Sequence, residues 1–580
     1  MQIVGSNRIL MKKYREYLVP SILTTLSLAF NEFVDTMLVS NLLGNDALSI
    51  VNMTMPIIFI QAACFLLIGS GGAILYAVSL GKWNSDKAGK YFSVSLMMAV
   101  GVSVGLVCLG LLLNNQIINL LCVNPAIKES YRICYFIQMC SSPAIIILNA
   151  MLCFMPSCGV PAVATIVNIV TNCVNLLMDI VFIRIFDTGV SGAYWATLTG
   201  QAVGIVVLVI LIKWRSISIV RSKISLSDIQ IAGDICKHGA ATSVLQIFYA
   251  FKVSINNQLA QKYGGADGVI AFSLCLQTFS ISSVFLLGIA DTAQPLLALL
   301  SGQKDYRNER TVFIRSLWLQ VIFSSGLIIV YMLFPGILTT LYGVDGQTAK
   351  ELGMHGIRLF AFTYLPRAIC IQNMRYHQVE HNKGYALAIS LFDGIALIPI
   401  SIILAFIIGI DGVFLCYPIT AVLMLIMIVI TNIILYNKKN GEYSSPLLIR
   451  KEEQGVYSNN YTITYESGFE EISQASISII AYCKDKGIPE KMSMHVGLLS
   501  EEMALYTVAH KQRIRTIDIL LRIMDDAIEL CFRSIGEPFD PTSRMECDKD
   551  ENITLLHKIS SGISYEYVMG MNNTKILIKR

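Results

Sequence analysis

Residues 165–183 read TIVNIVTNCVNLLMDIVFI, an apolar stretch that carries Asn168, Asn172, Asn175 and Asp179. In a helix, offsets of four, three and four place these polar groups on one face. A stretch this apolar is expected to lie in lipid, where an ionisable side chain costs about 2.5–3.5 kcal/mol on insertion scales. The pattern therefore predicts a polar, cation-binding cavity inside a membrane protein.

The composition divides the 580-residue chain into two parts. Charged residues make up 14% of the whole, with 47 of them in residues 1–440 and 37 in residues 441–580. The last 140 residues therefore have the charge content of an ordinary soluble domain, and the rest does not. The net charge of +4 is too small to indicate nucleic-acid binding. The scattered cysteines form no CxxC motif and predict no disulfide framework.

Apolar runs of bilayer length predict an all-α bundle of twelve transmembrane helices. They fall at about 17–40, 48–78, 92–114, 130–153, 160–184, 191–213, 237–260, 267–299, 312–334, 354–374, 384–408 and 411–436. Basic residues concentrate in the N-terminal arm and in alternate connections, whereas 41–46, 186–191 and 408–412 carry almost none. The positive-inside rule then places both termini in the cytoplasm of a plasma-membrane protein.

The two sets of six runs resemble each other. AVSLGKWNSDKAGKYF (77–92) aligns with ALLSGQKDYRNERTVF (298–313), which pairs Gly81 with Gly302 and Phe92 with Phe313. An apolar helix, a glycine, a charged loop and another helix recur at equal depth, as in a duplicated six-helix unit. The domains expected are an N-lobe (1–213), a C-lobe (214–440), a linker (441–457) and a cytoplasmic domain (458–580). Transporters commonly place their site between such repeats.

Several of these motifs resemble the multidrug and toxic compound extrusion (MATE) transporters. The resemblance covers about residues 14–437. The motifs are FNEFVDTMLVSNLLGNDALSIVNMTMPI (30–57), GSGGAILYAVSLGKWNSDKAGKYF (69–92), VNLLMDIVFIRIFDTGVSGAYWATLTGQ (174–201) and GIADTAQPLLALLSGQKDY (288–306). The resemblance implies a secondary antiporter that exports organic cations or related xenobiotics by alternating access. It implies no enzyme activity and no cofactor, with H⁺ or Na⁺ as the coupling ion.

The resemblance also implies a cation site in the N-lobe. Its members are Asp35, Asn149, Asn175, Asp179 and Thr197. The residues themselves agree for the first and fifth runs, because two carboxylates in a low-dielectric cavity cannot both remain ionised and unpaired. Either a proton is held between Asp35 and Asp179, or a cation such as Na⁺ bridges them with amide and hydroxyl oxygens. No other metal site is expected.

Other polar residues in the apolar runs are expected in the cavity, although isolated amides and hydroxyls often serve only in helix packing. They are Asn31, Glu32, Asn168, Asn172, Lys252, Asp291 and Asp393. Lys252, Asp291 and Asp393 depart from the family pattern, and burial cost suggests that Lys252 neutralises one of the acids. The substrate range is therefore left open.

Two other functions are compatible with a membrane domain followed by a soluble one. A lipid-linked saccharide flippase of the same superfamily needs arginine clusters to hold a pyrophosphate, and the arginines in the spans are few and dispersed. A membrane sensor that signals through the cytoplasmic domain is an alternative from another class. Export that survives deletion of that domain would favour the transporter.

The region from 458 onward predicts an α/β sandwich. Strand patterns occur at 461–467, 516–524, 526–534 and a closing pair joined through Asn572–Asn573, and helical patterns occur at 469–487, 491–511 and 551–560. The order resembles the GHKL-type ATPase fold of anti-sigma serine kinases. VGLLSEEMALYTVAH (496–510) keeps Glu502 and His510, but Tyr506 replaces the Mg²⁺-binding Asn.

The remaining nucleotide-binding motifs of that fold are also incomplete. FRSIGEPFDP (532–541) keeps Gly536 but lacks the acidic pair that contacts adenine, and NITLLHKI (552–559) lacks the glycines of the phosphate lid. We therefore expect a degenerate domain without ATPase or kinase activity. Its use would be scaffolding, regulation or the docking of a cytoplasmic protein partner.

Overall fold

The computed structural model describes residues 8–122, 125, 127–223, 228–341, 346–379, 382–438, 443, 445–449, 460–466, 468–510, 516–542 and 559–580. The chain divides into two compact units. The larger one, here the helical unit, comprises Tyr17–Lys304 and Phe313–Thr431. The smaller one, here the sheet unit, comprises Met1–Glu16, Asp305–Val312 and Asn432–Arg580.

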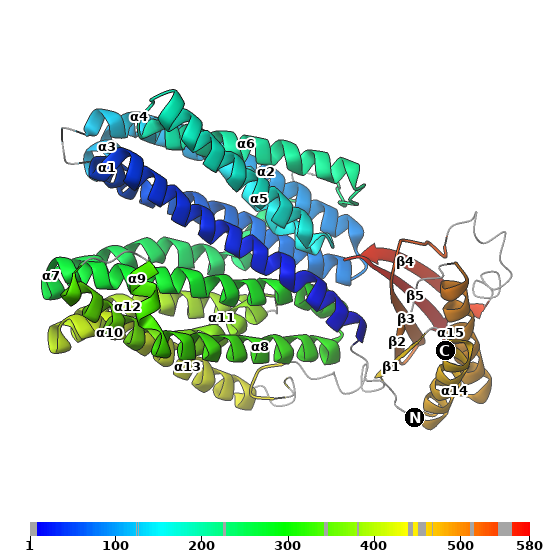
Figure 1. The fold of residues 1–580 in the computed structure, drawn as a ribbon. Coiled ribbons are helices and arrows are strands. Elements are labelled where there is room, and N and C mark those ends of the chain that lie inside the picture. Colours follow the sequence, from blue (N-terminus) through cyan, green and yellow to red (C-terminus); the bar gives the residue numbers. More distant parts are fainter. Residues whose placement is uncertain are drawn as a thin grey trace. The chain divides into compact units, whose positions relative to one another are not determined.

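The helical unit is a bundle whose helices run alongside one another (Figure 1). Among the described residues, nine helices are long and apolar enough to cross a membrane. The helices from α1 to α13, with the π-helix η1, are α1 (Arg8–Gly81), α2 (Ser85–Leu112), α3 (Asn114–Leu121), α4 (Lys128–Ser157), α5 (Pro161–Ile180), η1 (Val181–Ile185), α6 (Ser191–Trp214), α7 (Ile229–Gly302), α8 (Tyr306–Leu333), α9 (Pro335–Leu341), α10 (Gln347–Ala361), α11 (Tyr364–Val379), α12 (Lys383–Ile408) and α13 (Ile410–Lys438).

All twelve apolar runs are largely helical, but the breaks between the helices differ from the prediction. The helical assignment of α1 continues through 41–46, where a loop was expected. The break expected between 260 and 267 is a kink at Gly265, whose φ of 60° interrupts α7 without ending it. The run 354–374 is instead split at Phe362–Thr363 into α10 and α11. Hydropathy reports apolar length, whereas a break depends on local hydrogen bonds.

The repeat-related glycines Gly81 and Gly302 pack against each other at the ends of α1 and α7. A Cβ on Gly81 would contact the carbonyl oxygen of Leu299 and would lie 2.9 Å from the Cα of Gly302. A Cβ on Gly302 would likewise contact the carbonyl oxygen of Val78 and lie 2.9 Å from the Cα of Gly81. The two contacts mirror each other, so the aligned positions form one close helix crossing that only glycine permits.

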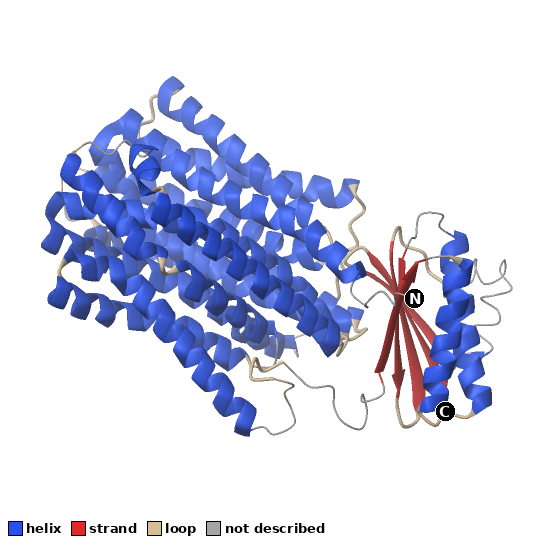
Figure 2. Ribbon diagram, turned by 60° about the horizontal axis from the view of Figure 1, so that its bottom comes forward, coloured by secondary structure: helices blue, strands red, loops and turns tan. Residues whose placement is uncertain are grey.

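The sheet unit contains a five-stranded antiparallel sheet in the order β1-β2-β3-β5-β4. Its elements are β1 (Asn460–Glu466), α14 (Phe469–Asp485), α15 (Glu490–His510), β2 (Thr516–Ile523), β3 (Ala527–Ile535), β4 (Gly562–Val568) and β5 (Met571–Lys579). Helices α14 and α15 cover one face of the sheet (Figure 2). The core between them includes Ile479, Leu499, Ile519, Leu530 and Ile576.

The closing hairpin turns three residues earlier than predicted. Asn572 and Asn573 lie inside β5, where they pair with Ser534 and Arg533 of β3. The turn is formed by Met569 and Gly570, whose φ values of 55° and 73° are typical of a tight primed turn. Most of the expected helix at 551–560 lies outside the described residues.

The centre of the other face of the sheet carries buried polar side chains. Arg533 on β3 lies 2.7 Å from Asp305 and 3.6 Å from Asp518 on β2, and all three side chains are almost fully buried. Asp305 also accepts a hydrogen bond from Asn308 (2.9 Å), and Asp518 accepts one from Thr464 (2.8 Å). The segment Asp305–Val312 thus belongs to the sheet unit through a buried ionic cluster.

Candidate functional site

The polar face predicted for α5 is buried within the helical unit. Asn168, Asn175 and Asp179 are at most 7% exposed, while Ile169, Leu177 and Ile180 on the same helix are at least 40% exposed. The helix begins at Pro161, which suits the first helical position because its missing N–H would be unpaired there. The periodicity therefore separates a buried polar face from an apolar, outward one.

Asn175 and Thr197 meet between α5 and α6. The Asn175 amide donates to the Thr197 hydroxyl over 3.4 Å, and that hydroxyl donates to the carbonyl of Ala193. Gly200 on α6 allows this approach, because a Cβ there would lie 2.9 Å from the carbonyl oxygen of Thr171. Two of the predicted site residues are thus joined by close packing of their helices.

Asp179 is the acid of this face and is deeply buried. It is 1% exposed, and neither carboxylate oxygen has a hydrogen-bond partner among the described residues. The charge of Asp35 on α1 lies close enough to act electrostatically on Asp179. The two acids therefore repel each other in the bundle, where an uncompensated charge is costly. A proton or a cation with oxygen ligands would offset this cost.

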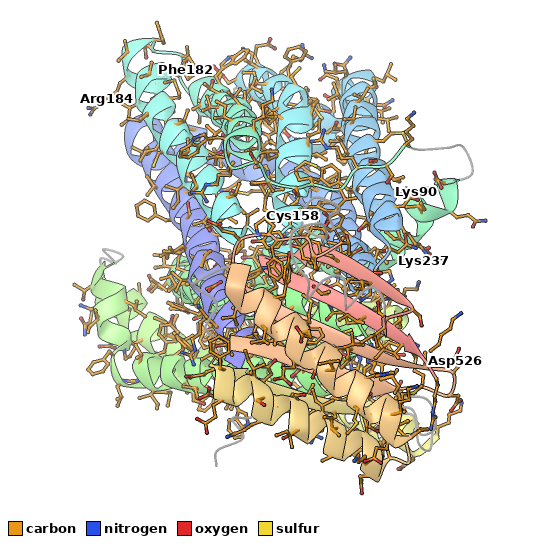
Figure 3. The ribbon with its side chains drawn as sticks, turned by 90° about the vertical axis from the view of Figure 1, so that its right-hand side faces the viewer. Lys90, Cys158, Phe182, Arg184, Lys237 and Asp526 are labelled. Carbon is orange, nitrogen blue, oxygen red and sulfur yellow. The ribbon has the colours of Figure 1, made fainter. Side chains whose placement is uncertain are left out.

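A π-helical segment, η1, directly follows this end of α5. Phe186 N–H donates to the carbonyl oxygen of Val181, the i→i+5 pattern that defines a π turn. Arg184 in this segment projects outward from the bundle (Figure 3). Isolated π turns often occur at functional sites, because they re-aim the adjacent side chains.

The other predicted polar residues make different contacts. The Asn149 amide donates to the carbonyl of Ile145 and to Gln201, and the Asn172 amide donates to Ser27. Asn149 and Asn168 line a cavity of about 260 Å³. Asn149 is thus held by Ile145 and Gln201, neither of which was predicted in the site. Asn31 is half-buried, and the side chain of Glu32 lies outside the described residues.

A second cluster of charges lies among α7, α11 and α12. The Lys252 ammonium lies 2.7 Å from one oxygen of Asp393, and the Arg367 guanidinium lies 2.6 Å from the other. The Lys252, Arg367 and Asp393 side chains are 2%, 13% and 4% exposed. Asp393 is therefore the acid that Lys252 contacts, and it is shared with an arginine.

Asp291 on α7 pairs with Arg375 on α11, with 2.7 Å between the guanidinium and the carboxylate. Both residues line the 260 Å³ cavity and a larger one of about 400 Å³, which Lys252, Arg367 and Asp393 also line. The two cavities thus share walls. For the described residues, no group of three His, Cys, Asp or Glu side chains is arranged to hold a metal ion.

The sequence analysis did not place Arg367 or Arg375 in a site. A signal was present, because Arg367, Ile371 and Arg375 recur at intervals of four on one face of α11, and all three line the larger cavity. Along the chain, Arg367 is one of several dispersed arginines and Arg375 belongs to the basic group at 375–383, so only the helical spacing relates them.

In the sheet unit, Tyr506 occupies the position of the expected metal ligand and is fully buried. Its ring lies 6.0 Å from that of Phe539, which lies 6.0 Å from that of Tyr565. The carbonyl oxygen of Gly536 accepts a hydrogen bond from Tyr567. Glu502 is half-buried, and the His510 side chain lies outside the described residues.

Known proteins resemble the helical unit. The chain is 19% identical over 409 residues to the multidrug export protein MepA of Staphylococcus aureus (strain MRSA252), covering 69% of this chain and 89% of the relative. It is also 19% identical over 376 residues to MepA of Staphylococcus saprophyticus, covering 63% and 81%. The share of each relative covered indicates that the likeness extends over most of these exporters.

Solved structures show the same fold. An outward-facing multidrug resistance MATE family transporter of the MOP superfamily aligns with a TM-score of 0.68 at 17% identity, covering 72% of this chain and 93% of that one. A MOP superfamily transporter from Pyrococcus furiosus aligns with a TM-score of 0.66 at 18% identity, with the same coverage. The MatE family model matches residues 20–181 and 240–407, more than half of the sequence. The chain therefore belongs to the MatE family of membrane transporters, as its motifs predicted.

Proposed function

We propose that this protein is a plasma-membrane antiporter that exports organic xenobiotics, including organic cations, in exchange for H⁺ or Na⁺. Twelve spans would form an N-lobe (1–213) and a C-lobe (214–440) that alternate access to the two sides, with both termini in the cytoplasm. The curated relatives are named as multidrug export proteins, which supports this substrate class. No organic cofactor is needed for such exchange.

The proposal depends mainly on the surroundings of the Asp179 carboxylate. Its carboxylate is buried, its oxygens have no hydrogen-bond partner among the described residues, and the Asp35 charge acts on it. A bound H⁺ or Na⁺ would remove the excess negative charge. Asn175 and Thr197, which are joined nearby on α5 and α6, would supply amide and hydroxyl oxygens to a bound Na⁺. Asn149 would ligate Na⁺ through its amide oxygen, because its nitrogen donates to Ile145 and Gln201.

Occupancy of this site would couple to helix packing because α5 and α6 are in close contact there. A ligand shifts a conformational equilibrium only by its differential affinity for the two states. A cation that binds the acids more tightly in one state would therefore favour that state. Cargo that binds better in the other state would be exchanged against it.

Transport of ethidium in proteoliposomes tests the proposal. Imposed proton and sodium gradients should each be applied to the wild type, Asp179→Asn and Asp35→Asn. We expect one gradient to drive transport in the wild type. Neither gradient should drive it in the two variants, because the neutral amide carries no charge for a bound cation to offset. Asp187→Asn, at an exposed acid after η1, is the matched control and should transport normally. Gradient-driven transport by Asp179→Asn would contradict the proposal.

We further propose that the C-terminal domain is a degenerate GHKL-like domain that scaffolds, regulates or docks a cytoplasmic partner. The buried Tyr506, packed on Phe539, supports this, because an aromatic ring there cannot ligate Mg²⁺. Calorimetric titration of the full chain with Mg-ATP is expected to show no binding at micromolar concentration. Micromolar affinity would overturn this part of the proposal.

A further inference from the structure

The cluster of Lys252, Arg367 and Asp393 contains two cations and one anion. Asp393 on α12 uses one oxygen toward Lys252 and the other toward Arg367, at 2.7 and 2.6 Å. Each cation therefore shares a carboxylate that is already paired with the other. Asn256 binds the backbone carbonyl of Lys252 rather than its ammonium. The cluster has a formal surplus of one positive charge.

The other ionisable residues that line this cavity do not remove the surplus. Asp291 and Arg375 are paired with each other at 2.7 Å and cancel. Of the Asp, Glu, Lys and Arg side chains on the cavity wall, only these five are present in the described part of the chain, three basic and two acidic. An uncompensated charge inside a protein is strongly unfavourable, so the surplus is relieved either by a bound counter-ion or by loss of the Lys252 proton.

The cavity around this charge has the size and lining of a small-molecule site. Its volume is about 400 Å³, within the range usual for ligand pockets. Phe59, Tyr249 and Phe279 contribute aromatic surface, and the Arg367 guanidinium lies 5.0 Å above the Phe279 ring. The wall thus combines apolar surface with one localised positive charge.

We infer that this cavity binds the carboxylate of an amphipathic organic monoanion or zwitterion, with Arg367 and Lys252 as the anion-binding pair. The guanidinium is the side chain best suited to a carboxylate, because its planar donors match the two oxygens. One surplus charge matches one carboxylate, whereas a pyrophosphate would leave negative charge in excess. The inference rests on the proposed export function for its biological role, since it names a chemical group of the cargo.

Equilibrium binding of two matched fluorescent probes tests the inference. Dansylglycine carries a carboxylate and dansylglycinamide does not, so their difference in affinity reports on that charge. With the purified full-length protein in chloride-poor buffer, we expect the wild type to bind dansylglycine at least about tenfold more tightly. Arg367→Met leaves a neutral Lys252–Asp393 pair and should abolish the preference. Equal affinities for both probes in the wild type would overturn the inference.

Two further variants keep the test decisive if Arg367→Met fails to fold. Asp393→Asn raises the surplus from one to two charges and should strengthen the preference for dansylglycine, which a merely structural ion cluster would not do. Arg358→Met is the matched control, because this exposed arginine of α10 does not line the cavity. An Asp393→Asn protein with an unchanged or weaker preference would contradict the inference.

The test separates the failure of this inference from that of the antiport proposal. The binding assay uses no gradient, so it is independent of ion coupling. Asp179→Asn should lose gradient-driven transport and keep the preference for dansylglycine. If a protein without this preference still shows gradient-driven transport, the anion site is ruled out and antiport is not. If a protein with the normal preference shows no gradient-driven transport, antiport is ruled out and the anion site is not.

Discussion

At the scale of single residues, the charged groups that the fold buries determine where the chain is sensitive. In the helical unit these include Asp179, without a hydrogen-bond partner among the described residues, and Asp393, which lies between two cations. In the sheet unit they include Asp305, Asp518 and Arg533. These buried groups differ in how many oppositely charged partners they have, so the effect of each substitution can be predicted.

Asp518 makes the stability of the sheet unit dependent on pH. Burial raises the pKa of Asp518 to about 6, against the opposing effect of the Arg533 guanidinium. The folded chain therefore holds this proton more tightly than the unfolded chain does. Protonated Asp518 makes its full contribution to stability below pH 3.8, and this contribution is lost as the pH rises through 6. Asp518→Asn should therefore stabilise the sheet unit by up to about 3 kcal/mol at pH 7.5, and little at pH 4.

Protease resistance of the C-terminal domain in the full-length chain, followed with a C-terminal tag during heating, measures this effect. Asparagine can still accept the hydrogen bond from Thr464, so the comparison isolates the charge. Equal stabilisation at both pH values would contradict the prediction. Asp305 has the opposite sign: although burial opposes it, Arg533 holds the pKa of Asp305 below its ordinary value, so this contribution is lost as the pH falls.

Arg533→Met should destabilise the sheet unit strongly. The substitution leaves Asp305 and Asp518 buried without their shared cation, which typically costs about 3–5 kcal/mol. Adding Asp305→Asn should recover part of the loss, because one buried charge is removed. The same protease assay applies, with Arg580→Met at the exposed C-terminus as the control. A loss no larger than that of the control would show that the cluster contributes little.

At the scale of elements, close helix crossings and tight turns constrain the fold more than helix length does. The crossing of α1 and α7 depends on Gly81 and Gly302, whose missing side chains are replaced by backbone of the opposite helix. The approach of α6 to α5 at Gly200 brings Thr197 to Asn175 in the same way. Each contact joins residues that lie far apart in the sequence or in separate apolar runs.

Gly81→Ala and Gly302→Ala should each destabilise the helical unit. An added Cβ would overlap the backbone of the facing helix, and overpacking of this kind costs about 1–3 kcal/mol. Gly101→Ala in α2 is the matched control, since no atom lies within 4 Å of its added Cβ, and it should be neutral or stabilising. Thermal unfolding of the purified protein, followed by the fluorescence of tryptophans that all precede residue 441, gives the comparison. Equal melting temperatures for the three variants would be inconsistent with this crossing.

The sequence predicts elements better than their junctions. The apolar runs locate the helices because burial in lipid requires length and hydrophobicity, which are local properties. The turn was placed at Asn572–Asn573 because both residues favour turns, yet Met569–Gly570 forms it, where glycine adopts a positive φ at no steric cost. Similarly, the periodicity of α5 predicts that Asn175 and Asp179 share a face. It does not predict that Arg367 will share Asp393 with Lys252, because that contact joins three helices.

At the scale of the whole molecule, the proposed function requires that two sites respond to each other. The acids Asp35 and Asp179 would hold the coupling ion, and the cavity of about 260 Å³, where the charges of Asp291 and Arg375 cancel, would hold a cationic cargo such as ethidium. Linkage requires the effect to be reciprocal: if a cation weakens the binding of cargo, cargo weakens the binding of the cation by the same factor. This coupling is the central claim, and it can be measured without transport.

The most direct measurement is the affinity of the purified protein for ethidium as a function of pH and of Na⁺ concentration, in the wild type and in Asp179→Asn. We expect the affinity of the wild type to fall as one of these cations becomes more concentrated, and that of Asp179→Asn to show no such dependence. A wild-type affinity that changes with neither pH nor Na⁺, or an Asp179→Asn affinity that changes as much as that of the wild type, would contradict this expectation.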